Sequence, residues 1–293
     1  MENLNGRVFL GRFRVDDLIS TDGGIFRYRG FDIKRSLALS IRAFDYKIPP
    51  DPSVLCFQQN SLTLQTIMHP NIIPFYGLYE DAGMSFVIEK YYEGPSLAQL
   101  LLQRAGKPLP PTEALIYLKA VAIALEYVHG FGLVHSTLSP INIQVTRDGS
   151  VMLGNFGFSR SLDKPMTETG VFGLPFYQAP EQLRAERVFP STDIYALGML
   201  FFELLTGIHP FLGVSSSAAG QVPEAARRLR EGLLTQDPPD PLKITGGLPA
   251  GLSQTLLTAL AKAPRERYQS AQEMLEISCA VLGTTPRQVP DRI

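Results

Sequence analysis

The spacing of apolar residues along the chain changes near residue 95. Before that point, short runs rich in β-branched and aromatic residues predict strands, and one longer run with helical spacing interrupts them. The predicted strands cover residues 13–20, 25–31, 37–44, 73–79 and 85–91, and the predicted helix covers residues 53–68. We therefore expect the first part of the chain to form a sheet with one helix.

After residue 95 the apolar positions recur at helical spacing over longer runs. The predicted helices cover residues 96–105, 111–130, 193–207, 223–234, 252–261 and 271–282. Pro111 and Glu113 suit the first turn of the second of these helices, and Gly130 suits its end. Strands with one helix, followed by helices, predict an α+β fold with a small β-rich lobe and a larger α-helical lobe.

Composition limits the class of protein. Hydrophobic residues make up 45% of the chain, enough for a sizeable core. The formal net charge is −1, so no global field attracts nucleic acid or an anionic membrane, and the longest apolar stretch, residues 195–202, is too short to span a bilayer. Cys56 and Cys279 lie far apart, and the chain starts without a signal-peptide pattern. We expect free buried thiols and a cytoplasmic location.

Residues 134–143 read Val-His-Ser-Thr-Leu-Ser-Pro-Ile-Asn-Ile. This segment resembles the catalytic loop of protein kinases, which has the pattern His-Arg-Asp-Leu-x-x-x-Asn. His135, Leu138 and Asn142 match it, whereas Ser136 takes the place of the arginine and Thr137 that of the catalytic aspartate. A hydroxyl does not accept the substrate proton as a carboxylate does, so this loop is expected to lack the catalytic base.

Further motifs follow in the order of the same family. They are His-Pro-Asn-Ile at 69–72, Leu-Gly-Asn-Phe-Gly at 153–157, Gly-Leu-Pro-Phe-Tyr-Gln-Ala-Pro-Glu-Gln at 173–182, Thr-Asp-Ile-Tyr-Ala-Leu-Gly at 192–198, Leu-Leu-Thr-Gly at 204–207 and Arg-Glu-Arg-Tyr at 265–268. Together they make the chain similar to bacterial serine/threonine protein kinases of the eukaryotic-like type over residues 10–283. The resemblance implies a kinase N-lobe at 10–92, a C-lobe at 93–283 and a linker-like tail at 284–293.

The resemblance implies architectural roles for seven residues that match the family. Four would form a stack of core side chains called the regulatory spine, one would hold the catalytic-loop backbone, and two would form a buried ion pair. They are Leu64, Phe75, His135 and Phe156 for the spine, Asp193 for the loop, and Glu181 with Arg267 for the ion pair. Breaking that pair is expected to cost about 3–5 kcal/mol.

The positions that contact nucleotide phosphates in the family have changed. Arg42 replaces the phosphate-binding lysine, and its planar guanidinium is not equivalent to an ammonium. Asn60 replaces the glutamate that pairs with that lysine, so the ion pair of the active state cannot form. Changing Arg42 is expected to cost about 1 kcal/mol or less if the side chain is half exposed.

The phosphate loop has lost its glycines. Ser20, Asp22 and Ile25 stand at the three glycine positions, where side chains obstruct a close approach of phosphate to the backbone. Asp22 would also repel an anion. Gly23-Gly24 instead predicts a tight hairpin turn between two strands.

The adenine slot is expected to be polar rather than apolar. Arg27, Ser40 and Gln144 stand where the family has apolar side chains, and Glu89 aligns with the gatekeeper position. Buried polar groups need partners, which leaves open an ion pair between Glu89 and either Arg27 or Arg42.

The metal ligands of the family align with Asn142 and Asn155. Magnesium usually takes carboxylate or phosphate oxygen, and two neutral amides supply no anionic ligand. Ser139 also replaces the lysine of the catalytic loop. We therefore expect neither a bound metal ion nor another cofactor.

These substitutions favour a pseudokinase, that is, a kinase fold that is not an enzyme and acts as a protein-binding scaffold or allosteric regulator with weak or no ATP binding. Two alternatives stay open: metal-independent nucleotide sensing, which Arg42 supports, and a repurposed nucleotidyl or phosphoryl transferase. Arg227, Arg228 and Arg230 mark a candidate surface for a protein partner on helix 223–234, although a solvated basic face is the simpler explanation. Contact with nucleic acid or a membrane is not expected.

Overall fold

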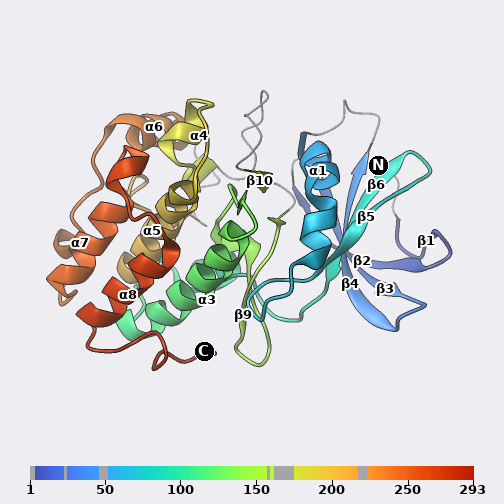
Figure 1. Cartoon of the computed structure of the whole chain (residues 1–293), viewed down its shortest axis with the longest axis horizontal. Coiled ribbons are helices and arrows are strands. Elements are labelled where there is room, and N and C mark those ends of the chain that lie inside the picture. Colours follow the sequence, from blue (N-terminus) through green and yellow to red (C-terminus); the bar gives the residue numbers. More distant parts are fainter. Residues whose placement is uncertain (1–3, 23–24, 46–51, 157–158, 162–174, 217–222) are drawn as a thin grey trace. The chain divides into compact units, whose positions relative to one another are not determined.

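A computed structural model describes residues 4–22, 25–45, 52–156, 159–161, 175–216 and 223–293. The chain divides into two compact units, Met1–Glu93 (unit 1) and Gly94–Ile293 (unit 2). The predicted boundary after residue 92 lies next to this division. Figure 1 colours the elements of each unit along the chain.

Unit 1 contains a six-stranded sheet in the order β1-β2-β3-β4-β6-β5, and every neighbouring pair is antiparallel. The strands are β1 Val8–Phe9, β2 Phe13–Asp22, β3 Ile25–Asp32, β4 Leu37–Asp45, β5 Phe75–Asp81 and β6 Met84–Lys90. Helix α1, Pro52–Thr66, packs against β5. The five predicted strands and the predicted helix are all present, whereas β1 has only two residues and so shows no alternation.

The two faces of this sheet differ because side chains alternate along a strand. One face packs on an apolar core, in which Phe9 of β1 stacks on Phe86 of β6 with ring centroids 3.9 Å apart. The buried core residues are Leu4, Phe9, Phe13, Val15, Tyr28, Leu39, Ile41, Ala43, Met84, Phe86 and Ile88. On β4, Ser40 and Arg42 alternate with the core residues Leu39, Ile41 and Ala43, so they belong to the opposite face.

Unit 2 is mainly helical. Its helices are α2 Leu97–Arg104, α3 Pro111–His129, α4 Pro180–Leu183, α5 Pro190–Thr206, α6 Pro223–Thr235, α7 Ala250–Ala259 and α8 Ala271–Val281. Helix α5 is buried along nearly its whole length, packs against α3, α7 and α8, and forms the centre of the unit (Figure 1). Its apolar residues lie all round the helix, as in a helix enclosed by others.

Two short antiparallel ribbons in unit 2 flank the segment that resembles the catalytic loop. Strand β7, Leu133–Val134, pairs with β10, Arg160–Ser161. Strand β8, Ile143–Val145, pairs with β9, Val151–Leu153. The loop thus runs from β7 to β8, and both of its ends are fixed by strand pairing.

The last ten residues contact unit 2 instead of extending as the predicted linker. The Nζ atom of Lys119 on α3 donates to the carbonyl of Val289 at 2.7 Å and pairs with Asp291 at 2.6 Å. Val289 is buried, and the amide of Ile293 donates to the carbonyl of Gly149 at 3.0 Å. Prolines in the tail suggested a linker, but composition could not show that Lys119 and the turn after β8 offer partners.

Cys279 on α8 is buried and its thiol is free. Burial raises the pKa of this thiol, which makes it a poor nucleophile. Cys56 lies in α1, and its side chain is outside the described part of the chain. None of the helices that the structure describes combines the length and the apolar character needed to cross a bilayer.

His209 is a fully buried imidazole that follows α5. Its Nε2 atom lies 2.7 Å from the carbonyl oxygen of Phe176, and the amide of Phe211 donates to its Nδ1 atom at 3.3 Å. A ring that accepts at Nδ1 and donates at Nε2 is neutral. Burial lowers the pKa of His209 to about 4.

We expect this histidine to make the protein less stable in mild acid. An unfolded histidine titrates near pH 6.5, so its neutral form stabilises the fold above that pH, and this contribution is lost as the pH falls towards about 4. The loss should reach about 3 kcal/mol of unfolding free energy. Urea denaturation between these two pH values should show a weaker pH dependence in His209→Gln than in the parent. Parallel curves for the two proteins would contradict a depressed pKa at His209.

Candidate functional site

Four polar side chains share the face of the sheet in unit 1 that is turned away from the apolar core. The Nη2 atom of Arg42 on β4 lies 2.9 Å from Oε1 of Glu89 on β6, and their side chains are only 10% and 8% exposed. Arg27 lies opposite Arg42 in the register, and Ser40 lies opposite Glu89. The Nε atom of Arg27 donates to Ser40 Oγ at 3.1 Å. Glu89 therefore pairs with Arg42 rather than with Arg27.

Burial sets the electrostatics of this ion pair. Burial lowers the pKa of Arg42, the carboxylate of Glu89 acts in the opposite direction, and nearby Arg27 lowers the pKa further. An arginine keeps its proton at physiological pH, so the carboxylate offsets a permanent buried charge. Asn60 on α1 is also buried, but its neutral amide cannot serve as a second anionic partner.

The strands around the degenerate phosphate loop form a hairpin, as predicted. Ser20 pairs with Arg27 across β2 and β3, and Asp22 pairs with Ile25. Ser20 is exposed. Gly23 and Gly24, and the side chains of Asp22 and Ile25, lie outside the described part of the chain.

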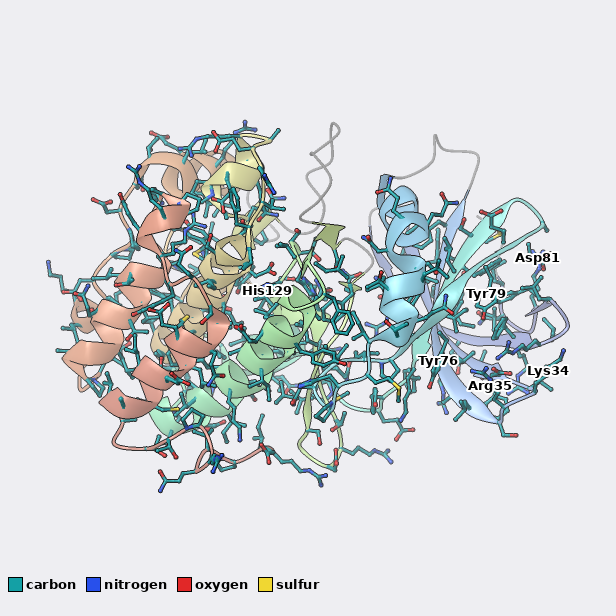
Figure 2. The ribbon with its side chains drawn as sticks, viewed as in Figure 1. Lys34, Arg35, Tyr76, Tyr79, Asp81 and His129 are labelled. Carbon is teal, nitrogen blue, oxygen red and sulfur yellow. The ribbon has the colours of Figure 1, made fainter. Side chains whose placement is uncertain are left out.

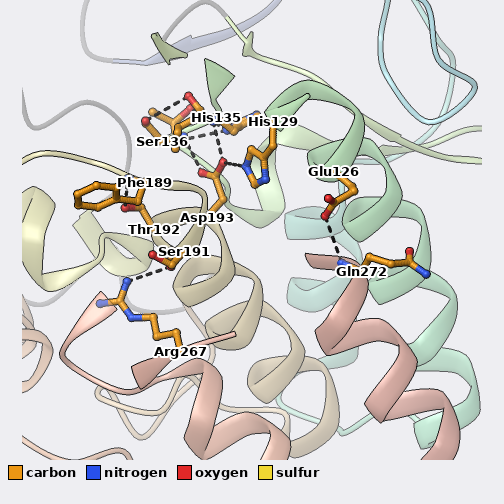
Figure 3. A network of polar contacts seen from close by, with 12 residues as sticks. Glu126, His129, His135, Ser136, Phe189, Ser191, Thr192, Asp193, Arg267 and Gln272 are labelled. Atoms are coloured by element: carbon orange, nitrogen blue, oxygen red, sulfur yellow. Dashed lines mark hydrogen bonds and ion pairs between the residues drawn. The ribbon is translucent and has the colours of Figure 1, made fainter. Parts of the chain in front are cut away.

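In unit 2, Asp193 holds the backbone of the loop that follows β7. Its two carboxylate oxygens accept from the amides of His135 and Ser136, each at 2.8 Å (Figure 3). His129 at the end of α3 places its Nε2 atom 2.7 Å from the same carboxylate. Sequence reasoning missed His129, because it lies 64 positions before Asp193 in the chain and no local pattern reveals the contact. Ser136 has φ of 66°, so the loop adopts a left-handed conformation at that residue.

Hydrogen bonds inside the loop order the degenerate positions. The amide of Thr137 donates to Nδ1 of His135 at 3.3 Å, which leaves Nε2 to donate to the carbonyl of Gly154 at 2.9 Å. The Nδ2 atom of Asn142 donates to the carbonyl of Thr137 at 2.7 Å and lies 3.3 Å from Ser139 Oγ. These side chains stabilise the loop, and none of them is a carboxylate.

The two asparagines at the metal positions do not fit a magnesium ion. The side-chain Nδ2 atom of Asn142 donates within the loop, and the main-chain carbonyl of Asn142 accepts from the amide of Gly154 at 2.9 Å. Asn155 follows with φ of 67° and supplies a neutral side chain. Among the described residues, no group of three or more histidine, cysteine, aspartate or glutamate side chains could hold a metal ion. Magnesium bound here would lack an anionic protein ligand.

The four spine residues divide between the two units. Leu64 on α1 and Phe75 on β5 are buried in unit 1, on two elements that pack together. His135 and Phe156 lie in unit 2 with ring centroids 4.7 Å apart in an edge-to-face arrangement. Each unit therefore contains two of the four residues, and all four are buried.

Gln144 contacts backbone at the start of unit 2. Its Nε2 atom donates to the carbonyls of Gly94 and Pro95. The amide of Val145 also donates to Pro95, at 2.9 Å. The Gln144 side chain, expected in a polar adenine slot, thus anchors the first residues of unit 2.

Glu181 on α4 and Arg267 form a bidentate ion pair with contacts of 2.7 and 2.8 Å, and their side chains are 2% and 0% exposed. Thr192 Oγ1 donates to the same carboxylate at 2.8 Å. Arg267 also donates to the carbonyl of Ser191 (Figure 3) and to the carbonyls of Ala261 and Lys262. The pair joins α4, the start of α5 and the segment before α8, with its charges paired and hydrogen-bonded.

A second buried carboxylate, Glu203 on α5, was not predicted. It accepts hydrogen bonds from the hydroxyl of Tyr177, from Ser215 Oγ at 2.9 Å and from the amide of Ser216 at 2.8 Å. Burial raises the pKa of Tyr177 well above 10. A glutamate inside an apolar helix run is the signal that could have identified this centre, because a buried carboxylate needs donors.

The proposed partner helix is present as α6, and Arg230 is exposed on it. The side chains of Arg227 and Arg228 lie outside the described part of the chain.

Comparison with known proteins identifies relatives over most of the chain. The family model described as Protein kinase domain matches residues 57–278. The serine/threonine-protein kinase PrkC of Bacillus subtilis is 30% identical over 275 residues, which cover 92% of this chain and 40% of PrkC. The probable serine/threonine-protein kinase SCO3848 of Streptomyces coelicolor is 30% identical over 273 residues, which cover 90% of this chain and 39% of SCO3848.

A crystal structure of the PknI kinase domain of Mycobacterium tuberculosis superposes with a TM-score of 0.74 at 23% identity. The superposition covers 95% of this chain and 100% of that domain, which shows the shared fold. The chain spans about 40% of the length of these two curated relatives, PrkC and SCO3848.

These comparisons correct the expectation that the chain is not an enzyme. That expectation rested on single positions such as Thr137 and Asn155, whereas the relatives at 28–30% identity are named serine/threonine-protein kinases and point to an enzyme. The family match, the β-rich first unit and the helical second unit agree with one another. The chain therefore belongs to the protein kinase domain family and has the protein kinase fold, with a β-rich N-lobe and a helical C-lobe.

Proposed function

We propose that this domain acts mainly by binding a protein partner, as a scaffold or allosteric regulator, and that it binds ATP weakly. The observation that carries the proposal is the buried ion pair between Arg42 and Glu89. Arg42 stands at the position of the family's phosphate-binding lysine, and here its guanidinium already has an anionic partner in its own sheet.

Phosphate would have to compete with Glu89 for Arg42. The two side chains are about nine-tenths buried and 2.9 Å apart. Moving Arg42 to a phosphate would leave the carboxylate of Glu89 buried without its cation, and the loss of a buried partner costs about 3–5 kcal/mol. This cost reduces the affinity for ATP. It also weakens the alternative function of nucleotide sensing, because Arg42 was the main residue that supported that function.

Phosphoryl transfer is the activity that the names of the relatives indicate for this family. In this chain it would proceed without a carboxylate at position 137, where Thr137 Oγ1 lies 3.4 Å from Nδ1 of His135. A positioned general base contributes about 10²–10⁴-fold to a proton transfer. We propose that transfer by this domain is slower than in its relatives by a factor of this order.

The proposed partner site is α6, where Arg230 is exposed and Arg227 and Arg228 share the helix. A helix with exposed arginines suits an acidic protein surface. We also propose a cytoplasmic location, because the buried thiol of Cys279 is free and free thiols are typical of reducing compartments.

Titration with ATP tests the proposal. At 1 mM ATP and a Kd of about 1 mM, binding adds only about 0.4 kcal/mol, which corresponds to about 1–2 °C in Tm for a protein of this size. We expect this small shift with or without magnesium, because Asn142 and Asn155 add no anionic metal ligand. Differential scanning calorimetry measures the shift.

Two controls sharpen the measurement. Glu89→Leu releases Arg42, so its ATP-induced shift should exceed that of the parent, whereas Lys243→Ala, at an exposed residue of unit 2, should change nothing. A shift of several degrees in the parent at sub-millimolar ATP would refute weak binding, as would a smaller shift in Glu89→Leu. A rate of phosphate transfer in the parent that Thr137→Asp fails to increase would refute the role assigned to position 137.

A further inference from the structure

A group of basic and aromatic side chains lies at one end of unit 1 and does not include the ion pair of Arg42 and Glu89. Lys34 and Arg35 are exposed in the turn between β3 and β4, and Tyr76 lies on the edge strand β5. Figure 2 shows these three residues at the same end of the unit. The Nζ atom of Lys90 lies 4.8 Å from the ring centroid of Tyr92. We call these five residues the basic–aromatic surface.

The members of this surface are close enough to influence one another. Burial raises the pKa of the Tyr76 phenol, and the charges of Lys90 and Arg35 oppose that rise. The charge of Tyr92 raises the pKa of the same phenol. Two cations from different strand ends and two phenols thus converge near β5.

The buried carboxylate of Asp32 fixes the backbone of the turn that carries Lys34 and Arg35. Asp32, whose side chain is only 3% exposed, accepts hydrogen bonds from the amides of Lys34 at 3.0 Å and Arg35 at 3.1 Å. The Nη2 atom of Arg12 pairs with the same carboxylate at 2.7 Å, and this contact lowers the pKa of Asp32. The backbone conformation is therefore fixed before any ligand arrives, which reduces the entropy lost on binding.

The charge of this surface is not balanced locally. Arg12 offsets Asp32, but within the described residues no ion pair involves Lys34, Arg35 or Lys90. The chain as a whole has a net charge of −1, so the excess of positive charge is a local property. Guanidinium and ammonium groups beside phenol hydroxyls provide donors that suit carboxylates.

We propose that the basic–aromatic surface binds a short, extended acidic segment of a partner protein. Lys34, Arg35 and Lys90 would meet its carboxylates, and Tyr76 and Tyr92 would supply hydroxyl donors and apolar ring surface. The cations are few, and the same sheet carries Asp16, Asp17 and Asp81. A long polyanion such as nucleic acid depends on many phosphate contacts and fits this surface less well.

Fluorescence anisotropy with a labelled peptide of about eight alternating glutamate and serine residues tests the proposal on the full 293-residue chain. In about 50 mM salt, Lys34→Ala combined with Arg35→Ala should weaken binding by about tenfold or more, because two charge-assisted contacts are lost. Lys243→Ala combined with Arg265→Ala removes the same charge from exposed sites in unit 2 and should change the Kd less than about twofold.

Tyr76→Phe removes one hydroxyl and should weaken the peptide by about threefold to fivefold. Both charge variants alter exposed side chains, so equal thermal transitions will confirm that they fold. Equal loss of affinity in the two double variants would overturn the proposal, since net charge alone would then explain binding. Binding of a single-stranded oligothymidylate as tightly as the peptide, with the same sensitivity to Lys34 and Arg35, would also overturn it.

Discussion

Glu181→Ala is expected to lower the free energy of unfolding by about 3–5 kcal/mol. The substitution leaves the guanidinium of Arg267 without its carboxylate in a site where neither side chain is more than 2% exposed. It also removes the acceptor of Thr192 Oγ1 at the start of α5, the central helix of unit 2. Chemical denaturation followed by circular dichroism measures the loss.

Two comparison variants separate the buried pair from the general loss of a glutamate. Glu186→Ala changes an exposed side chain close to α4 and should alter stability by less than about 0.5 kcal/mol. Glu181→Met combined with Arg267→Met removes both charges and should recover much of the loss, because no charge stays buried alone. A cost near 1 kcal/mol for Glu181→Ala would show that water or another group compensates Arg267.

The elements of the fold could be predicted because each carries a local signal. Short runs rich in β-branched and aromatic residues predicted β2 to β6, and the helical runs predicted the long helices with ends shifted by a few residues. Helix α5 begins at Pro190 instead of Asp193, since proline suits a first turn and Thr192 Oγ1 accepts from the amide of Phe189 at 3.0 Å. The contacts of the tail with Lys119 and Gly149 depend on residues far away in sequence, and no local pattern reveals them.

The candidate site, too, has a part that the sequence predicts and a part that only the structure shows. The motifs named the residues at each position, including Glu181, Asp193 and Arg267, and the structure gives these three buried hydrogen-bonding partners. The choice of Arg42 over Arg27 as the partner of Glu89 could not be predicted, because the two arginines are opposite each other on one face of the sheet. Only the three-dimensional positions of their guanidinium groups decide it.

Burial of Arg42 changes the expected cost of its loss. From the sequence alone, the loss of Arg42 is expected to cost about 1 kcal/mol or less of unfolding free energy, on the condition that its side chain is half exposed. The side chain is only 10% exposed and its partner Glu89 only 8%, so that condition does not hold. Arg42 is a buried member of an ion pair in unit 1, so the smaller cost does not apply to it.

We therefore expect Arg42→Ala to lower the free energy of unfolding by about 3 kcal/mol, at the lower end of the range for a broken buried pair. The carboxylate of Glu89 would stay in the sheet without its cation, beside the neutral hydroxyl of Ser40 on the paired strand. Urea denaturation of the parent and of Arg42→Ala measures the difference. Arg27→Ala is the matched control and should cost less, because Arg27 donates to the neutral hydroxyl of Ser40.

The double variant Arg42→Met with Glu89→Met decides whether the cost comes from the stranded charge or from lost packing. Methionine restores apolar volume at both positions, so a stranded charge predicts that the double variant is close to the parent or more stable. If the double variant is as unstable as Arg42→Ala, the two side chains act through shape and contacts with neighbours. A double-mutant cycle gives the coupling directly, and coupling below about 0.5 kcal/mol would contradict a structural ion pair at this position.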